Sequence, residues 1–239
     1  MTTTVLITGA NKGLGYETAR RLAERGWRVV LGARDPLRGE QAIQALALLG
    51  LKAELLVLDV TSEESVRQAA ADFSKAYGQL DVLINNAGVG GSREHPAQTG
   101  AAALAEMYQA NVFGVVRMMQ AFLPLLQAAK NPRVVMVSSS LGSSHTMTGK
   151  GGATFEAGLL QLAYPSSKAA LNMLVTQYAK ALPTIRINAV NPGFTKTDIN
   201  HHTGHQTVTE GTDAIVTLAS IGNDGPTGGF FDRHGEIPW

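Results

Sequence analysis

The sequence has no cysteine, no marked excess of charge and no long apolar run. The absence of cysteine excludes disulfides, thiolate catalysis, and zinc or iron–sulfur sites built on thiolates. Twenty basic and nineteen acidic side chains give a formal net charge of +1, which predicts neither a nucleic-acid footprint nor a polybasic membrane patch. No apolar stretch approaches the roughly 18 residues that span a bilayer. The first residues lack the features of a signal peptide, so we expect a cytoplasmic protein without membrane partners.

Length and patterning predict one α/β domain spanning residues 1–239. The 239 residues, 44% of them hydrophobic, fall just below the ~250–300 residues at which a single core tends to divide. Apolar runs alternate with segments of helical periodicity, which predicts a doubly wound, Rossmann-type parallel sheet of about seven strands with helices on both faces. Such sheets bind ligands at the carboxyl ends of their strands. The predicted strands are Val5–Thr8, Val29–Leu31, Leu55–Leu58, Asp81–Ile84, Val134–Val137, Arg186–Val190 and Gly229–Phe231.

A glycine-rich turn lies between the first predicted strand and the helix Leu14–Arg25. Glycines permit a tight turn there and let the backbone approach a pyrophosphate, which then meets the N–H groups at the start of the helix. The spacing alone is weak evidence, but a strand before it and a helix after it make a dinucleotide site a fairly specific prediction. The turn's cofactor-binding candidates are Gly9, Asn11, Lys12, Gly13, Leu14 and Gly15.

The end of the second predicted strand indicates which dinucleotide is bound. NAD-binding sites place an acid there for the ribose 2′-hydroxyl, whereas a nearby arginine accommodates a 2′-phosphate. Here that position holds Ala33, which is followed by Arg34, and Lys12 supplies a second cation. Asp35 is an alternative acid, but Pro36 after it favours a role as a helix cap. The sequence therefore predicts NADP(H) as the cofactor.

Tyr164 and Lys168 stand four residues apart in a predicted helix, where positions i and i+4 share a face. Lowering the pKa of a tyrosine from about 10 by roughly three units requires about 4 kcal/mol. A cation about 4 Å away, at an effective dielectric near 20, supplies about that much. The pair predicts a tyrosine general acid, although the same spacing also arises from an ordinary aromatic residue and a solvated lysine. Pro165 disfavours helical geometry at Tyr164, so we expect the tyrosine to cap the helix.

Together these motifs resemble the short-chain dehydrogenase/reductase family, and within it the NADPH-dependent carbonyl reductases. The resemblance covers nearly the whole chain, and several motifs in the right order are far more specific than any one of them. The motifs are the Thr8–Gly15 turn, Asp59-Val60, Asn85-Asn86-Ala87-Gly88, Asn111, Ser138-Ser139, Tyr164 with Lys168, and Asn191-Pro192-Gly193. Asn11-Lys12-Gly13, Ala33-Arg34-Asp35 and Asp224-Gly225-Pro226-Thr227-Gly228 are similar to the carbonyl reductases in particular.

The resemblance implies roles for individual residues. Tyr164 would donate a proton to the carbonyl oxygen and Ser139 a hydrogen bond to it. Lys168 would lower the tyrosine pKa and hold the nicotinamide ribose, and Asn111 would hold a water that links Lys168 to solvent. Ser139 is chosen over the adjacent serines by the resemblance alone. Further cofactor contacts are implied for Asp59 and Val60 at the adenine, Asn86, Ala87 and Gly88 along the cofactor's path, and Pro192, Gly193 and Thr195 at the nicotinamide.

The predicted reaction is NADPH-dependent reduction of a ketone or aldehyde to an alcohol, with a small-molecule carbonyl compound as the substrate. One alternative is oxidation of an alcohol with NADP+ at the same site. Another is a sensor that binds NADP(H) without turnover, which has no need for Ser139, Tyr164, Lys168 and Asn111 together. A homo-oligomer is compatible with the sequence.

Two further segments have more than one interpretation. The glycine-rich stretch Ser140–Ala163 is either a wall of the substrate site or a surface insertion. The cluster His201-His202-Thr203-Gly204-His205 suggests a metal, but histidines in a polar stretch are more often solvated, so we expect no metal. Its position after the sixth strand favours a lid over the substrate.

Overall fold

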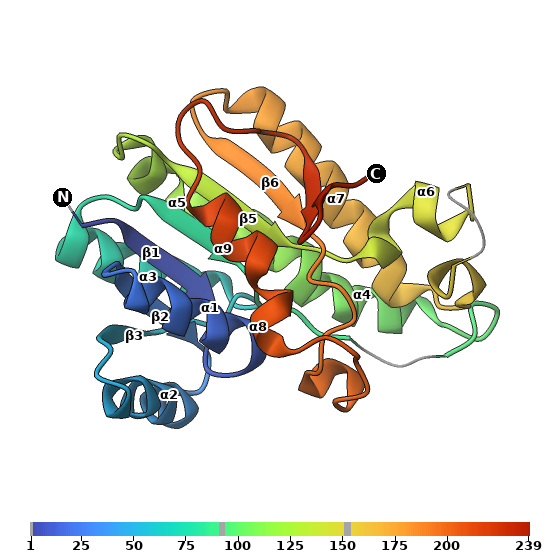
Figure 1. Ribbon diagram of the computed structural model, residues 1–239, viewed down its shortest axis with the longest axis horizontal. Coiled ribbons are helices and arrows are strands. Elements are labelled where there is room, and N and C mark those ends of the chain that lie inside the picture. Colours follow the sequence, from blue (N-terminus) through green and yellow to red (C-terminus); the bar gives the residue numbers. More distant parts are fainter. Residues whose placement is uncertain (1, 91–93, 151–153) are drawn as a thin grey trace.

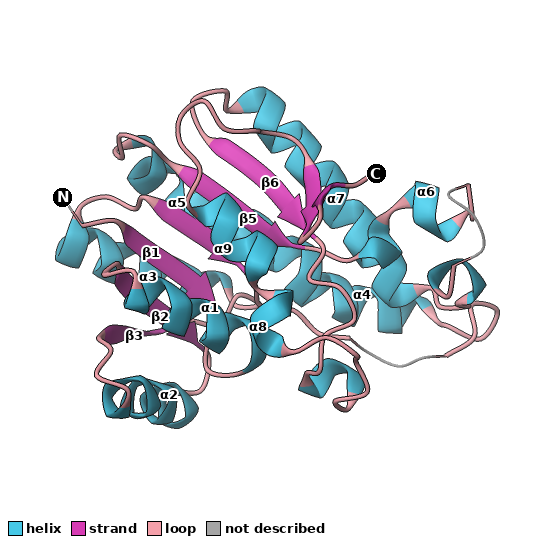
Figure 2. Ribbon diagram, in the orientation of Figure 1, coloured by secondary structure: helices cyan, strands magenta, loops and turns pink. Residues whose placement is uncertain are grey.

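The computed structural model describes residues 2–90, 94–150 and 154–239. Over these residues the chain forms a central eight-stranded sheet with the order β3-β2-β1-β4-β5-β6-β7-β8 (Figure 2). β1 to β7 are parallel, which confirms the doubly wound prediction, and β8 adds an antiparallel strand that the sequence did not predict. The strands are β1 (Thr4–Thr8), β2 (Arg28–Ala33), β3 (Ala53–Val57), β4 (Val82–Asn85), β5 (Arg133–Val137), β6 (Arg186–Val190), β7 (Phe230–Asp232) and β8 (Gly235–Glu236).

Helices cover both faces of the sheet (Figure 1). α1, α2 and α9 pack on one face through one buried cluster, and α3, α5 and α7 pack on the other through a second. Among the described residues, no helix has both the length and the apolar character that a membrane crossing requires. The helices are α1 (Gly13–Glu24), α2 (Pro36–Leu48), α3 (Glu63–Tyr77), α4 (Ala101–Tyr108), α5 (Gly114–Gln127), α6 (Ser144–Met147), α7 (Ala163–Ala181), α8 (Val208–Gly211) and α9 (Asp213–Ala219).

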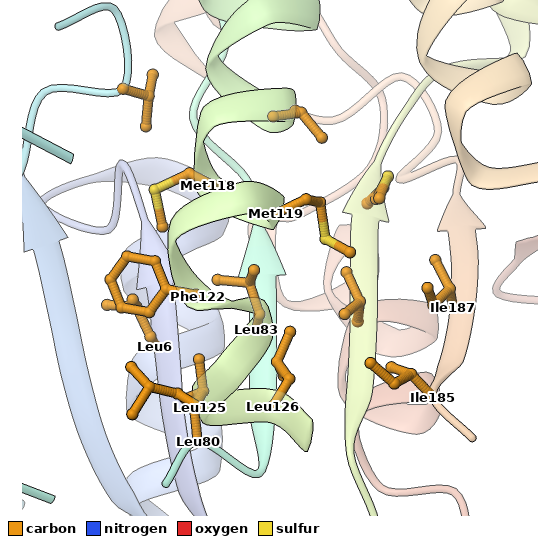
Figure 3. Close-up of a cluster of buried hydrophobic side chains, with 14 of the residues drawn as sticks. Leu6, Leu80, Leu83, Met118, Met119, Phe122, Leu125, Leu126, Ile185 and Ile187 are labelled. Carbon is orange, nitrogen blue, oxygen red and sulfur yellow. The ribbon is translucent and has the colours of Figure 1, made fainter. Parts of the chain in front are cut away.

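The core under α5 shows why the strand sequences are continuous apolar runs. Met118, Met119 and Phe122 point from α5 toward Leu83 and its neighbours on the sheet (Figure 3). All of these side chains are buried, because a parallel strand covered on both faces exposes neither. This packing holds the sheet in place. The carboxyl ends of β1, β4, β5 and β6 lie together along one edge of that sheet.

The start of α2 confirms the interpretation of Asp35 as a helix cap. Its carboxylate accepts hydrogen bonds from the backbone N–H of Leu37 and of Arg38, at 3.0 and 3.2 Å. Pro36 follows as the first helical residue, where no backbone N–H is needed. Asp35 is therefore engaged in local structure at the end of β2.

Candidate active site

The glycine turn between β1 and α1 is held from the neighbouring strand β4. Gly9 and Gly13 have φ angles of 62° and 56°, in the region that favours glycine. A Cβ on Gly9 would lie 2.9 Å from the Cα of Ala87, so the turn also packs closely. The side-chain amide of Asn86 donates to the carbonyl oxygens of Thr8 and Gly9, at 2.8 and 3.1 Å. Asn86 and Ala87, predicted as cofactor contacts, thus support the turn.

The amino end of α1 fits an anionic group. Its cap residue Lys12 is extended and makes no side-chain capping bond, and the first turn carries no acidic residue. The first N–H groups of the helix therefore have no partner from a capping side chain. Gly15 is crowded, because a Cβ there would come within 2.6 Å of both the Asn86 amide and the Gly9 carbonyl oxygen. These residues fit the pyrophosphate of a dinucleotide.

A surface groove of about 560 Å³ lies beside this turn, between α1 and α2. Arg38 lines it together with Lys12, and sequence reasoning missed this arginine because only the helical turn of α2 brings it there. Arg34, the predicted cation, follows β2 directly and is exposed. Ala33 is buried at the strand end. The groove is lined by Asn11, Lys12, Tyr16, Arg38, Gln41, Ala42, Ala45 and Asp198.

Lys12 is already paired with a carboxylate. Its ammonium forms an ion pair with Asp198, which lies 186 residues further along the chain in the segment after β6. Asp198 also contacts the ring of His202, whose Nε2 lies 2.9 Å from the second carboxylate oxygen. The hydrogen bond from Lys12 holds the pKa of Asp198 below its usual value. The predicted phosphate-binding lysine therefore bridges two loops of the site.

Asp59 and Val60, predicted to contact adenine, both have structural roles at the end of β3. The Asp59 carboxylate accepts hydrogen bonds from the N–H and hydroxyl of Thr61, at 2.9 and 2.7 Å. Val60 is 9% exposed and packs against Gly114, where a Cβ would lie 3.0 Å from its side chain. Contact with adenine stays a prediction for both residues.

At the end of β5, the structure distinguishes the neighbouring serines. The Ser138 hydroxyl is buried and donates to the side-chain oxygen of Asn172 at 2.6 Å. Ser139 is only partly buried, and its hydroxyl lies near enough to the phenol of Tyr164 to lower the pKa of that group. Ser139 is therefore the serine that faces the tyrosine, and Asn172 is a positioning residue that sequence reasoning missed.

Tyr164 lies inside α7, so the expectation that it caps the helix is wrong. The helix begins at Ala163, which makes Pro165 its third residue. Proline is tolerated in the first turn of a helix, because the N–H groups there have no partner within the helix. Lys168 consequently follows one full turn later, and its Nζ lies 5.6 Å from the centre of the Tyr164 ring.

The pKa values differ from the expectation that Lys168 acidifies the tyrosine. Burial raises the pKa of Tyr164 to about 12, and the hydrogen bond with Ser139 only partly opposes this. Burial also lowers the pKa of Lys168 to about 8. The lysine ammonium donates to the carbonyl oxygen of Val137 at 2.8 Å. Both shifts have the same physical cause, since a buried site disfavours the charged form of each group.

Asn111 lies in a π turn, Gln109–Phe113, that interrupts the helix predicted over Ala101–Ala129. Its side-chain amide donates to the carbonyl of Val89 at 3.0 Å and to the Ser167 hydroxyl at 3.1 Å. A Cβ on Gly88 would lie 3.0 Å from the Asn111 oxygen and 3.8 Å from the Lys168 ammonium. Gly88 thus allows Asn111 and Lys168 to approach each other. Single π turns frequently occur at functional sites.

The loop after β6 joins the site through a residue to which sequence reasoning gave no separate role. The side-chain oxygen of Asn191 accepts from the N–H of Ser140 and of Gly193, both at 3.1 Å. It therefore ties the loop after β5 to the loop after β6. Gly193 has a φ of 71°, and Thr195 is buried with its hydroxyl donating to the Pro192 carbonyl at 2.8 Å. Contact of Pro192, Gly193 and Thr195 with a nicotinamide stays a prediction.

The histidine cluster and the long loop are partly folded. Over the described ranges, no group of three or more histidine or acidic side chains is arranged to hold a metal. The His205 ring packs against Phe194, with centroids 5.9 Å apart. In the stretch Ser140–Ala163, of which 151–153 lie outside the described residues, Figure 1 shows α6 beyond the sheet, near the start of α7. Phe155 and Leu160 are 73% and 63% exposed there.

Comparisons with known proteins agree with this arrangement. A family model described as short chain dehydrogenase matches residues 3–207. The chain belongs to the short-chain dehydrogenase family, which confirms the resemblance. It is 36% identical to "Short-chain dehydrogenase/reductase 1" of Saponaria officinalis, over 98% of this chain and 95% of that protein. It is 34% identical to a (+)-neomenthol dehydrogenase of Arabidopsis thaliana, over 95% of both. An NADPH-bound carbonyl reductase from chicken fatty liver has a similar structure, with a TM-score of 0.87, 27% identity, and coverage of 100% of this chain and 99% of the other.

Proposed function

We propose that this protein reduces a ketone or aldehyde to the corresponding alcohol with NADPH. One observation carries the proposal: Ser139, Tyr164 and Lys168 converge at the carboxyl end of β5. The Ser139 hydroxyl lowers the pKa of the phenol, and Lys168 lies one helical turn from Tyr164 on α7. The similarity to an NADPH-bound carbonyl reductase supports the same assignment.

The residues present fit NADP(H). The glycine turn and the amino end of α1 would hold the pyrophosphate. Lys12, Arg34 and Arg38 would provide cations for the 2′-phosphate, since two of them line one groove and the third follows β2 directly. When bound, NADPH supplies the hydride for the carbonyl carbon.

The chain's own residues would stabilise the charge that develops on the substrate's carbonyl oxygen and would donate a proton to that oxygen. With its pKa raised to about 12, Tyr164 is protonated at neutral pH and is able to donate. Ser139 would donate a hydrogen bond to the same oxygen, a contact of a kind worth about 2.7–4 kcal/mol. The hydroxyl of Ser167 donates to the Tyr164 carbonyl at 2.8 Å and accepts from Asn111, which fixes the first turn of α7.

Lys168 would return a proton to Tyr164 after each turnover. With its pKa lowered to about 8, it is able to gain and lose a proton near neutral pH. Asn111 is placed beside it across Gly88, which supports the predicted link from Lys168 to solvent.

Loss of NADPH absorbance on addition of a panel of ketones and aldehydes tests the proposal. Tyr164→Phe should lower turnover by about 10²–10⁴-fold while leaving NADPH binding intact, because the acid is removed and the cofactor site is not. Tyr178→Phe is the matched control, since it removes a phenol from the same helix. NADPH binding without turnover across the whole panel would favour a sensor instead, and retained activity in Tyr164→Phe would require another acid.

A further inference from the structure

We propose that Asp198 competes with the 2′-phosphate of the cofactor for Lys12, and so sets how strongly the protein prefers NADPH over NADH. This inference rests on the proposed function, because it concerns the cofactor of the same site. It assigns a role in cofactor preference to a residue outside the glycine turn and outside β2.

The position of Asp198 supports the competition. It lies in the 3₁₀ turn Asp198–Asn200, after β6, yet it lines the same groove as Lys12 and Arg38. The adjacent residue Thr197 lies against the glycine turn, since a Cβ on Gly13 would be 3.9 Å from its methyl group. A carboxylate from the segment after β6 is thus placed on the lysine that a 2′-phosphate would bind.

Both cations of the groove have carboxylate partners, but the two partners are held differently. Arg38 pairs with Asp35 at 3.4 Å, and that carboxylate also caps α2 through two backbone N–H groups. Asp198 is 52% exposed at its side chain, and its carboxylate contacts the side chains of Lys12 and His202. An incoming dianion therefore displaces Asp198 from Lys12 more easily than Asp35 from Arg38.

The displacement of Asp198 from Lys12 should accompany binding of only one of the two dinucleotides. NADPH brings a phosphate that needs Lys12, so binding it breaks the Lys12–Asp198 pair. NADH presents a hydroxyl at the same place and leaves the pair intact. Removal of the Asp198 charge should therefore strengthen NADPH binding and leave NADH binding nearly unchanged. Because the ion pair is exposed, we expect a gain of about two- to fivefold.

Calorimetric titration of the full chain with NADPH and with NADH tests this inference. The proteins are the wild type, Asp198→Asn, Lys12→Gln and the double variant. Asp198→Asn should lower the Kd for NADPH about two- to fivefold at low salt, should not change the Kd for NADH, and should lose its effect in the Lys12→Gln background. Glu64→Gln is the control, because Glu64 belongs to an exposed ion pair with Arg67 on α3.

Each other outcome is decisive. An unchanged Kd for NADPH in Asp198→Asn overturns the competition, as does an equal gain for NADH. The same gain without Lys12 would mean general repulsion between Asp198 and the phosphate, and it also overturns the competition. If the wild type binds neither dinucleotide, the proposed function fails together with this inference; normal NADPH binding without an effect of Asp198 defeats the inference alone.

Discussion

The ammonium of Lys168 lies 5.6 Å from the centre of the Tyr164 ring and donates to the carbonyl oxygen of Val137. The lysine is thus anchored to β5. Burial dominates, and it raises the pKa of Tyr164 to about 12. The tyrosine is therefore a protonated acid throughout the neutral range.

This relationship predicts how the site responds to pH. Ultraviolet difference spectra between the wild type and Tyr164→Phe should show no tyrosinate from Tyr164 below about pH 10. Oxidation of an alcohol needs the deprotonated phenol, so its kcat/KM should rise close to tenfold per pH unit between about pH 7 and 10. A tyrosinate that appears near pH 7 would contradict the structure and restore the role of Lys168 that the sequence suggests.

Much of the fold was predictable because its signals are local. The strands β1 to β7 are short apolar runs bounded by turns, and alternation with helices determines the parallel sheet. β8 escaped prediction, since Gly235 and Glu236 form a strand only by pairing with β7. The cap at Asp35 was predictable because Pro36 marks the first helical residue.

The candidate site was predictable in its residue types but not in its pairings. Tyr164 and Lys168 could be found from their spacing, yet the direction of the lysine depends on the strand β5, which is remote in sequence. The same is true of Asn172 and Asn191, whose partners in the segment after β5 lie 30 to 51 residues away. The ion pair between Lys12 and Asp198 spans 186 residues, so no local pattern indicates it.

The buried charge of Lys168 should reduce stability. Its pKa falls from 10.5 to about 8 on folding, so the folded state binds fewer protons than the unfolded state between these values. Stability from this group therefore increases as pH rises through that window, and at neutral pH its burial costs about 3 kcal/mol. Lys168→Met should abolish activity but raise the free energy of unfolding at pH 7.

Chemical unfolding of the wild type and Lys168→Met at several pH values measures this effect. The stability advantage of the methionine variant should shrink between about pH 8 and 10.5, where the wild-type lysine is neutral in the folded state but still charged in the unfolded state. An advantage that does not change with pH would indicate better packing of methionine, and a loss of stability at pH 7 would contradict the predicted cost.

Substitution of Ser139 should lower mainly catalysis, whereas substitution of Ser138 should lower mainly stability. Ser139→Ala removes the hydroxyl that faces Tyr164, so kcat should fall about 10²–10³-fold with little change in stability. Ser138→Ala leaves the buried oxygen of Asn172 without its 2.6 Å donor, which should cost about 1–3 kcal/mol of stability. Steady-state kinetics and denaturant unfolding of both variants give the comparison. A larger catalytic loss in Ser138→Ala would reverse the assignment.

Trp239 should affect the substrate side of the site from a distance. Its ring stacks on Phe230 with centroids 5.2 Å apart, and its carbonyl oxygen accepts from the N–H of His145 at 3.1 Å. The neighbouring Pro238 carbonyl accepts from the Ser143 hydroxyl at 2.9 Å. These bonds hold the loop that follows Ser139. Trp239→Ala should therefore raise KM for the carbonyl substrate several-fold while the Kd for NADPH stays unchanged.

Trp239→Phe keeps an aromatic ring for stacking on Phe230 and should retain most of the wild-type KM. Leu48→Ala is a matched control, because that side chain is 90% exposed and lies on α2, away from the loop. Equal changes in KM and in cofactor Kd for Trp239→Ala would point to a general loss of structure. A wild-type KM would mean that Ser143 and the backbone of the 140–147 segment hold the loop without the tryptophan ring.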